Sequence, residues 1–159
     1  MSRIGKTLMC IVAGLFIGVM AQAGDQATEK KLNKSDLPPA VQVTADRESA
    51  GGKVTGYSQG TDDGQIVYQV EMTTNGVPRE VLIGSDGTVV AVQSEVQWDQ
   101  LPADVQNGLK EQAGSNKLGK VSSVTKNGNI VGYETFVTRN GKKEEIHVGP
   151  DGKLMTSSR

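Results

Sequence analysis

The chain has 159 residues, with 17 lysines and arginines, 18 aspartates and glutamates, one histidine and one cysteine. Its formal net charge is −1 at pH 7, so it carries no basic footprint of the kind that binds phosphate backbones. Nucleic acid is therefore not expected as a partner. A single histidine and a single cysteine also exclude a two-histidine metal site and a zinc site built from cysteines.

Residues 1–23 have the layout of a secretory signal peptide. Arg3 and Lys6 precede an uncharged apolar run over 8–20, and the small residues of Ala21-Gln22-Ala23 follow it. The run is shorter than the roughly 20 residues that a membrane-spanning helix needs. We therefore expect cleavage after Ala23 and a periplasmic or secreted product with no stable membrane insertion. Residues 24–35, which contain almost no apolar side chains, predict a flexible lead-in.

From residue 36 onward the sequence can be laid over itself, which predicts duplicated structural units. The matching segments are Leu37-Pro38 with Leu101-Pro102, Tyr68 with Tyr133, Asn75-Gly76 with Asn140-Gly141, Glu80 with Glu145, and Asp86-Gly87 with Asp151-Gly152. We interpret residues 36–94 as the first unit and residues 95–159 as the second.

Each unit is predicted to begin with a helix. In the first unit, Ser35 or Asp36 would cap a helix with proline in its opening turn, and Gly51-Gly52 would end it. In the second unit, Asp99 and Gly114 have the same positions at the two ends. The apolar residues that recur at helical spacing are Leu37, Val41 and Ala45 in the first helix and Leu101, Val105 and Leu109 in the second. A glycine at position 108 costs about 1 kcal/mol relative to alanine, which predicts a short or bent second helix.

Strands follow each predicted helix. Apolar Tyr68 and Val70 alternate with polar Gln69 and Glu71, which is typical of a strand with one buried face. Asn-Gly and Asp-Gly pairs suit the tight hairpin turns that need positive φ. The predicted fold class is therefore α+β, with two tandem units, each a helix packed on a four-stranded antiparallel meander sheet.

These motifs resemble the PepSY-like family. The resemblance rests on a Leu-Pro helix start, a tyrosine in the second strand, a glycine turn, a Glu-Val or Glu-Ile pair such as Glu80-Val81 and Glu145-Ile146, and a closing Asp-Gly. It covers residues 36–159. The family is similar in fold to the beta-lactamase inhibitor protein, in which a combined sheet forms a concave binding surface. This chain lacks the paired cysteines of that inhibitor.

The side chains offer little for catalysis. His147 is the one candidate base for a Ser-His-Asp arrangement, but it lies between Ile146 and Val148, so strand alternation predicts an outward, solvated histidine. Glu80 and Glu145 have matching positions and hence like environments, whereas a glycosidase needs two carboxylates of unlike pKa. We therefore expect no enzyme activity, no cofactor and no metal site.

The outward face of the strands is the candidate protein-binding surface. Its predicted members are Gln69, Glu71, Glu80, Leu82, Glu134, Phe136, Glu145 and His147. Apolar side chains within an acidic surround are typical of an interface, although the same residues would also suit an ordinary solvated sheet. The leading hypothesis is an exported, non-catalytic module that inhibits or sequesters a protein or peptidase of the cell envelope. The alternative is a periplasmic protein that binds a small molecule or an ion.

Overall fold

The computed structural model describes residues 30–62 and 64–155. The predicted signal peptide and residues 24–29 of the lead-in lie outside this part. The strands are β1 (Lys30–Leu32), β2 (Gly52–Asp62), β3 (Gln65–Thr74), β4 (Val77–Gly84), β5 (Val89–Val96), β6 (Leu118–Lys126), β7 (Asn129–Arg139) and β8 (Lys142–Val148). The α-helices are α1 (Pro39–Glu48) and α2 (Ala103–Ala113), each preceded by a short 3-10 helix, η1 (Lys34–Asp36) and η2 (Trp98–Gln100). Neither α-helix is long and apolar enough to cross a membrane.

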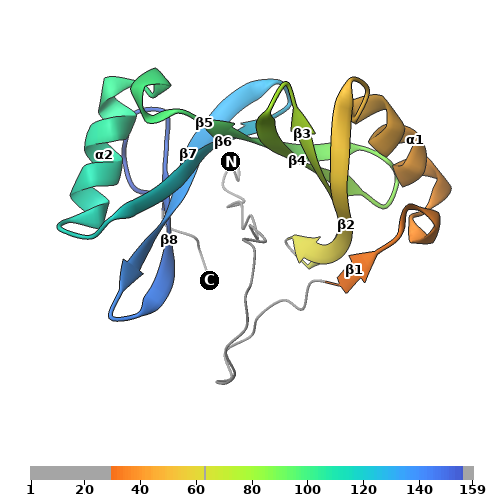
Figure 1. Ribbon diagram of the computed structural model, residues 1–159, viewed down its shortest axis with the longest axis horizontal. Helices are drawn as coiled ribbons and strands as arrows, with labels where there is room; N and C mark the ends of the chain where they lie inside the picture. Colours follow the sequence, from red (N-terminus) through yellow and green to blue (C-terminus); the bar gives the residue numbers. More distant parts are fainter. Residues whose placement is uncertain (1–29, 63, 156–159) are drawn as a thin grey trace, which may run out of the picture.

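All eight strands belong to one antiparallel sheet, in which each strand pairs with the next along the chain (Figure 1). The predicted fold class of two tandem units, each with its own four-stranded sheet, is therefore wrong. The two halves are joined because β5 pairs with β6, from Val92 opposite Thr125 to Val96 opposite Val121. The pairing satisfies backbone groups that two separate sheets would leave on exposed edges.

The strands also divide unequally between the two halves. Residues 30–32, which were predicted to be part of the lead-in, form β1 and pair with β2. The first half therefore contributes five strands, because β1 precedes α1 and β2 to β5 follow it. The second half contributes three strands, β6 to β8, all after α2. A fourth segment of the second half contributes only an isolated bridge between Val148 and Leu154.

Both helices begin later than the predicted caps. Ser35-Asp36 and Asp99 lie in the 3-10 helices η1 and η2, and the α-helices start after Pro38 and Pro102. Leu37 has an extended backbone conformation, with φ −74° and ψ 144°, because the residue before a proline is disfavoured in the α region. The Leu-Pro pair thus separates a short turn from the helix proper in each half.

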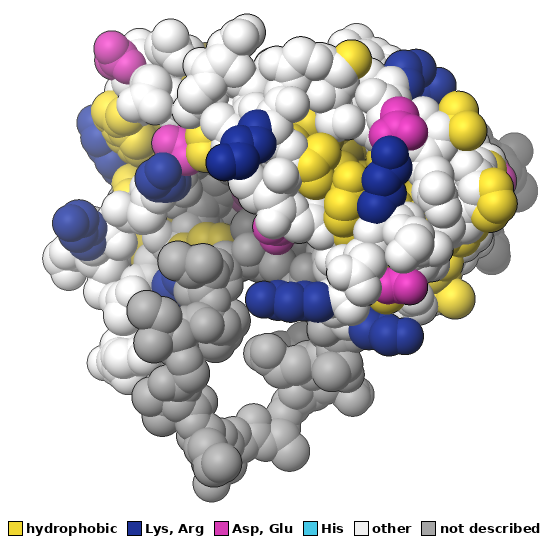
Figure 2. All heavy atoms as spheres, turned by 45° about the vertical axis from the view of Figure 1, so that its right-hand side comes forward, with side chains coloured by type: hydrophobic (Ala, Val, Ile, Leu, Met, Phe, Trp, Pro, Cys, Tyr) yellow, Lys and Arg dark blue, Asp and Glu magenta, His cyan; other side chains and the backbone are white. Residues whose placement is uncertain are grey.

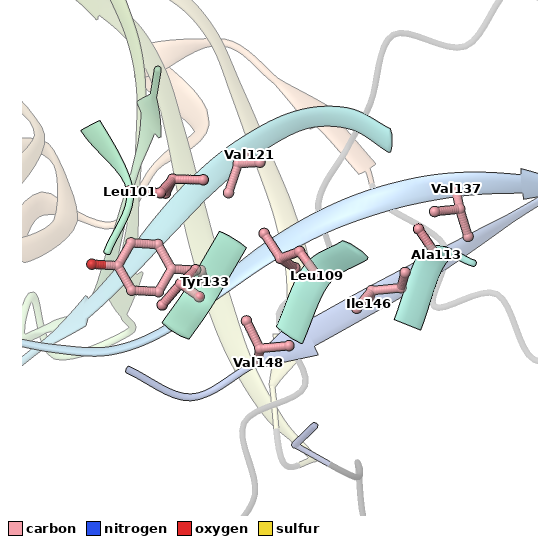
Figure 3. Packing of buried hydrophobic residues seen from close by; sticks show 9 residues of the cluster. Leu101, Leu109, Ala113, Val121, Tyr133, Val137, Ile146 and Val148 are labelled. Atoms are coloured by element: carbon pink, nitrogen blue, oxygen red, sulfur yellow. The ribbon is translucent and has the colours of Figure 1, made fainter. Parts of the chain in front are cut away.

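Two hydrophobic clusters hold the helices against the same face of the sheet. The cluster under α1 contains Leu37, Val41, Ala45, Tyr68, Val70, Met72, Val81 and Ile83. The cluster under α2 contains Leu101, Val105, Leu109, Ala113, Val121, Tyr133, Val137, Ile146 and Val148, and Figure 3 shows their side chains converging between the helix and strands β6 to β8. Figure 1 shows α1 and α2 at opposite ends of the curved sheet, on its outer side.

The two Asp-Gly turns pack directly against the helices. A Cβ atom placed on Gly108 of α2 would lie only 1.9 Å from the backbone oxygen of Gly152, so only glycine fits here. Gly87 contacts the backbone of Ala40 in α1 in a similar way. Close approach to a turn therefore explains the glycine at position 108. It does not shorten the second helix as predicted, because α2 spans 11 residues and α1 spans 10.

The predicted Asn-Gly hairpin turns are confirmed by their backbone conformation, whereas in the Asp-Gly pairs only the glycine has positive φ. Asn75 and Gly76 have φ values of 52° and 80°, and Asn140 and Gly141 have φ values of 51° and 75°. Two successive residues with positive φ match the right-handed twist of the flanking strands. These turns connect β3 to β4 and β7 to β8. The resulting pairing places Glu71 beside Glu80 and Glu134 beside His147 on one face of the sheet.

Candidate functional site

The sheet face opposite the two helices, here called the uncovered face, carries a mainly polar set of side chains. Strand pairing places Glu71 opposite Glu80 and Glu80 opposite Gln93. A second row crosses β5 to β8 and contains Glu95, Ser122, Glu134 and His147. Among the described residues, both helices pack on the other face, so the uncovered face has no helix over it.

Two adjoining hollows form a groove, here called the sheet groove, in which Pro78, Glu95 and Ser122 line both parts. The first part has a volume of about 280 Å³ and the second about 790 Å³. Further residues of the first part are Thr55, Glu71, Met72, Thr73, Arg79, Glu80 and Gln93, and those of the second are Lys117, Leu118, Gly119, Lys120, Phe136, Thr138 and Lys143. The groove therefore crosses the junction of β5 and β6, where the two halves of the sheet meet.

The two ends of the sheet groove differ in chemistry. One end has the carboxylates of Glu71 and Glu80, whereas the other end has the ring of Phe136 with the Lys143 ammonium 5.5 Å from its centroid. Between them, Lys120 Nζ lies 2.8 Å from Glu95 Oε2. An aromatic side chain flanked by charged groups is the composition that protein interfaces favour. Figure 2, which views the α1 side of the molecule, shows cations and anions interspersed with apolar side chains.

Glu134 is the most buried carboxylate of the uncovered face, with only 2% of its surface exposed. Neither of its side-chain oxygens has a hydrogen-bond partner. Burial, followed by the neighbouring carboxylates Glu145 and Glu80, raises the pKa of Glu134 to about 9. At neutral pH this carboxyl group is therefore protonated and uncharged.

His147 lies between two carboxylates. Its Nδ1 atom is 3.6 Å from Glu134 Oε2, and its Nε2 atom is 3.0 Å from Glu145 Oε2. The histidine side chain is 22% exposed, so it lies on the outward face as predicted but is only partly in contact with solvent. Strand alternation gave its face correctly, but the cross-strand pairing with Glu134 in β7 decides its surroundings. The three residues offer ligand atoms that all lie within 4.8 Å of one another.

The eight residues predicted for the binding surface fall into three groups. Glu71, Glu80 and Phe136 line the sheet groove. Glu134, Glu145 and His147 form the cluster at β7 and β8. Gln69 and Leu82 are 2% and 1% exposed, so they support this face rather than present contact area. The Gln69 amide oxygen instead accepts a 2.7 Å hydrogen bond from Ser58 Oγ.

Sequence reasoning did not find the groove residues of β5 and β6. Glu95 and Ser122 line both parts of the sheet groove, and they lie directly opposite each other. The alternation of Ala91, Gln93 and Glu95 could have placed β5 side chains on this face. The pairing between β5 and β6, which creates the groove, had no local sequence signal.

Solved structures with a similar fold come from Bacteroides. A candidate periplasmic protein of Bacteroides eggerthii aligns with a TM-score of 0.60 and 19% identity, covering 76% of this chain and 86% of that one. A DUF2874 family protein of Bacteroides ovatus has a TM-score of 0.58 and 22% identity, covering 76% and 85%. A BLIP-like protein of Bacteroides fragilis has a TM-score of 0.56 and 15% identity, covering 76% and 84%. This chain therefore has a BLIP-like fold.

No protein-family model and no curated protein sequence matches this chain. The similarity to the solved structures lies in the arrangement of helices and strands, since the identities are low. The shared fold does not fix a function, because one fold hosts many functions.

Proposed function

We propose that the chain is an exported, non-catalytic binding module whose uncovered face receives a protein or peptide of the cell envelope. The observation that carries the proposal is the sheet groove, which runs across a face that no described helix covers. Its shared wall of Pro78, Glu95 and Ser122 joins an acidic end to an end with an aromatic ring.

The chemistry of the groove favours a polypeptide ligand over a small apolar one. Phe136 is half-buried and offers a ring for packing, while Glu71 and Glu80 offer carboxylates at the other end. Aromatic anchors with a polar rim are typical of surfaces that bind proteins. The groove would place basic side chains of the ligand near the glutamates and apolar side chains near Phe136.

The fold comparison supports the same proposal. One neighbour is described as BLIP-like and another as a candidate periplasmic protein, which agrees with an exported module. Inhibition or sequestration of an envelope protein or peptidase is the specific form of the proposal. Periplasmic or secreted location rests on the signal-peptide layout of residues 1–23, and membership of the PepSY-like family rests on the motifs given above.

The test is a quantitative capture experiment with an envelope extract of the producing bacterium. The bait is compared with its Phe136→Ala and Glu95→Gln variants, each of which changes the sheet groove without touching a helix cluster. Val43→Ala is the matched control, because Val43 is 68% exposed on α1, which packs on the opposite face of the sheet. We expect both groove variants to reduce recovery of the same partner and the control to retain it. Equal recovery by all four baits would contradict the proposal.

A second candidate function, ion binding, is favoured by a separate observation. The cluster of Glu134, Glu145 and His147 combines two carboxylates with an imidazole at the far end of the uncovered face.

A further inference from the structure

The cluster of Glu134, Glu145 and His147 is built by the pairing of β7 with β8. Glu134 lies directly opposite His147 across the two strands, and Glu145 precedes His147 by two residues, so all three side chains share the uncovered face. One ligand atom from each residue can be chosen so that all lie within 4.8 Å of one another. The register of a regular hairpin therefore sets the geometry of the cluster, and no mobile loop is needed.

Glu134 distinguishes this cluster from an ordinary group of surface charges. Only 2% of the Glu134 residue is exposed, and neither carboxyl oxygen has a hydrogen-bond partner. The nearest cationic candidate, His147 Nδ1, lies 3.6 Å away, which is longer than a hydrogen bond. Buried polar groups are almost always paired, because a buried group without a partner loses the hydrogen bonds that water would give it. A carboxylate held in this way beside an imidazole has the properties of a metal ligand.

We propose that Glu134, Glu145 and His147 together bind one divalent transition-metal ion, with Zn²⁺ as the favoured species. An imidazole nitrogen with two carboxylate groups is a mixed nitrogen and oxygen donor set, which suits zinc and its neighbours in the first transition row. Calcium prefers six to eight oxygen ligands, and this cluster offers three residues, one of which supplies nitrogen. Metal binding displaces the proton of Glu134 into solvent, and the two carboxylates then balance the charge of a divalent ion.

The spacing of Glu134 and His147 is compatible with zinc. Tetrahedral zinc with bonds of about 2.0–2.1 Å places its ligand atoms roughly 3.3 Å apart. The Glu134 Oε2 and His147 Nδ1 atoms are already 3.6 Å apart. Glu145 Oε2 lies 3.0 Å from the other ring nitrogen, Nε2, so the imidazole or the Glu145 side chain must turn before all three residues bind one ion. The partial exposure of His147 gives an entry path from solvent. Three protein ligands would leave a fourth position for water or for a group of a bound partner.

The metal site is independent of the proposed protein partner. Glu145 is paired with Phe136 across β7 and β8, so the site adjoins the sheet groove without sharing its lining. A protein that binds zinc without binding a partner would support this inference alone, and capture of a partner by metal-free protein would support the proposed function alone.

The test is calorimetric titration of tag-free protein, stripped with chelator and dialysed, with Zn²⁺, Ca²⁺ and Mg²⁺ in separate runs. We expect one zinc ion per chain and much weaker binding of the other two cations. His147→Gln and Glu145→Gln should each weaken zinc binding by at least about tenfold, because even outer-shell changes at metal sites have effects of this size. Glu144→Gln is the matched control, since Glu144 is the adjacent residue of β8 and pairs with Arg139 instead.

A spectroscopic measurement keeps the inference testable if a variant folds poorly. The visible spectrum of Co²⁺ added to the wild-type protein reports its ligands and geometry, and it should change when His147 is replaced by Gln. The inference is overturned if zinc fails to bind, if it binds equally well to the Gln variants, or if Ca²⁺ binds to this cluster more tightly than Zn²⁺.

Discussion

The two faces of the sheet are built from alternating residues of the same strands, yet they differ in almost every property. In β3 and β4, Val70 and Val81 pair under α1 and are fully buried, while the adjacent Glu71 and Glu80 pair on the uncovered face. In β7, the same alternation separates Tyr133 beneath α2 from Glu134 beside His147. The helix-covered face therefore stabilises the fold through buried apolar contacts. The uncovered face keeps polar groups, including a buried carboxyl, that do not contribute to stability in this way.

The largest effect is expected from a truncation on the helix-covered face. Leu109 of α2 has no exposed surface and packs in the centre of the second cluster, so Leu109→Ala should lower the free energy of unfolding by about 2–5 kcal/mol. Urea denaturation followed by circular dichroism measures this change. Val43→Ala, on the exposed side of α1, should alter it by less than about 0.5 kcal/mol. Similar losses for the two variants would remove the distinction between the faces.

An effect of opposite sign is expected on the uncovered face. Because the folded-state pKa of Glu134 is about 9, above its ordinary value of 4.5, stability should decline as pH rises from about 4.5 towards 9. Glu134→Gln should remove this decline and, in chelator-treated protein at pH 8, raise the free energy of unfolding by about 1–3 kcal/mol. Denaturation curves across this pH range provide the measurement.

The control for Glu134 is Glu144, which lies in the neighbouring strand and is exposed beside Arg139. Glu144→Gln should leave the slope of stability against pH unchanged between pH 6 and 9. A Glu134→Gln variant with the slope of the wild type would show that this carboxyl is ionised in the folded protein at neutral pH.

The smallest effect is expected from a charged pair at the edge of the helix-covered face. Arg79 Nη2 lies 2.9 Å from Glu48 Oε2, and Arg79 Nη1 donates a 2.9 Å hydrogen bond to the Glu48 backbone oxygen at the end of α1. The Arg79 guanidinium holds the pKa of Glu48 below its ordinary value. Glu48→Gln should lower stability by about 0.2–1 kcal/mol at pH 7.

The sign of the pH effect at Glu48 is opposite to that at Glu134. A lowered pKa means that the stabilisation is present above the ordinary pKa of the carboxyl and is lost as pH falls below it. The wild type and Glu48→Gln should therefore converge in stability under acidic conditions. Thermal unfolding at pH 7 and at pH 3 measures the convergence, and a difference that grows on acidification would contradict the pairing.

Much of the fold was predictable because its signals are local. Asn75-Gly76 and Asn140-Gly141 adopt the turn conformations that their sequence favours, and the helical spacing of Val105 and Leu109 selects the face that α2 buries. The single sheet was not predictable in this way. Strands β5 and β6 pair through backbone hydrogen bonds between residues about 30 positions apart. Such bonds do not depend on particular side chains, so the sequence carries no local signal for them.

The candidate site was likewise predictable only where local sequence signals decide it. Alternation assigned Glu134 and His147 to the same face of the sheet, because the side-chain period of a strand is two. The sequence could not show that the two residues are direct cross-strand neighbours, nor that Glu134 would be buried. Those properties depend on register and on the curvature of the whole sheet, and they changed the interpretation of His147 from a solvated residue to a member of a cluster.

Binding of a partner at the uncovered face can be measured by covalent labelling of carboxyl groups in buffer and in envelope extract, followed by mass spectrometry. Glu71 and Glu95 report on the sheet groove, while Asp46 and Glu111 report on the exposed sides of the two helices. We expect the extract to protect Glu71 and Glu95 and to leave the labelling of Asp46 and Glu111 unchanged. Protection of the helix carboxylates alone, or no protection at either face, would contradict binding at the uncovered face.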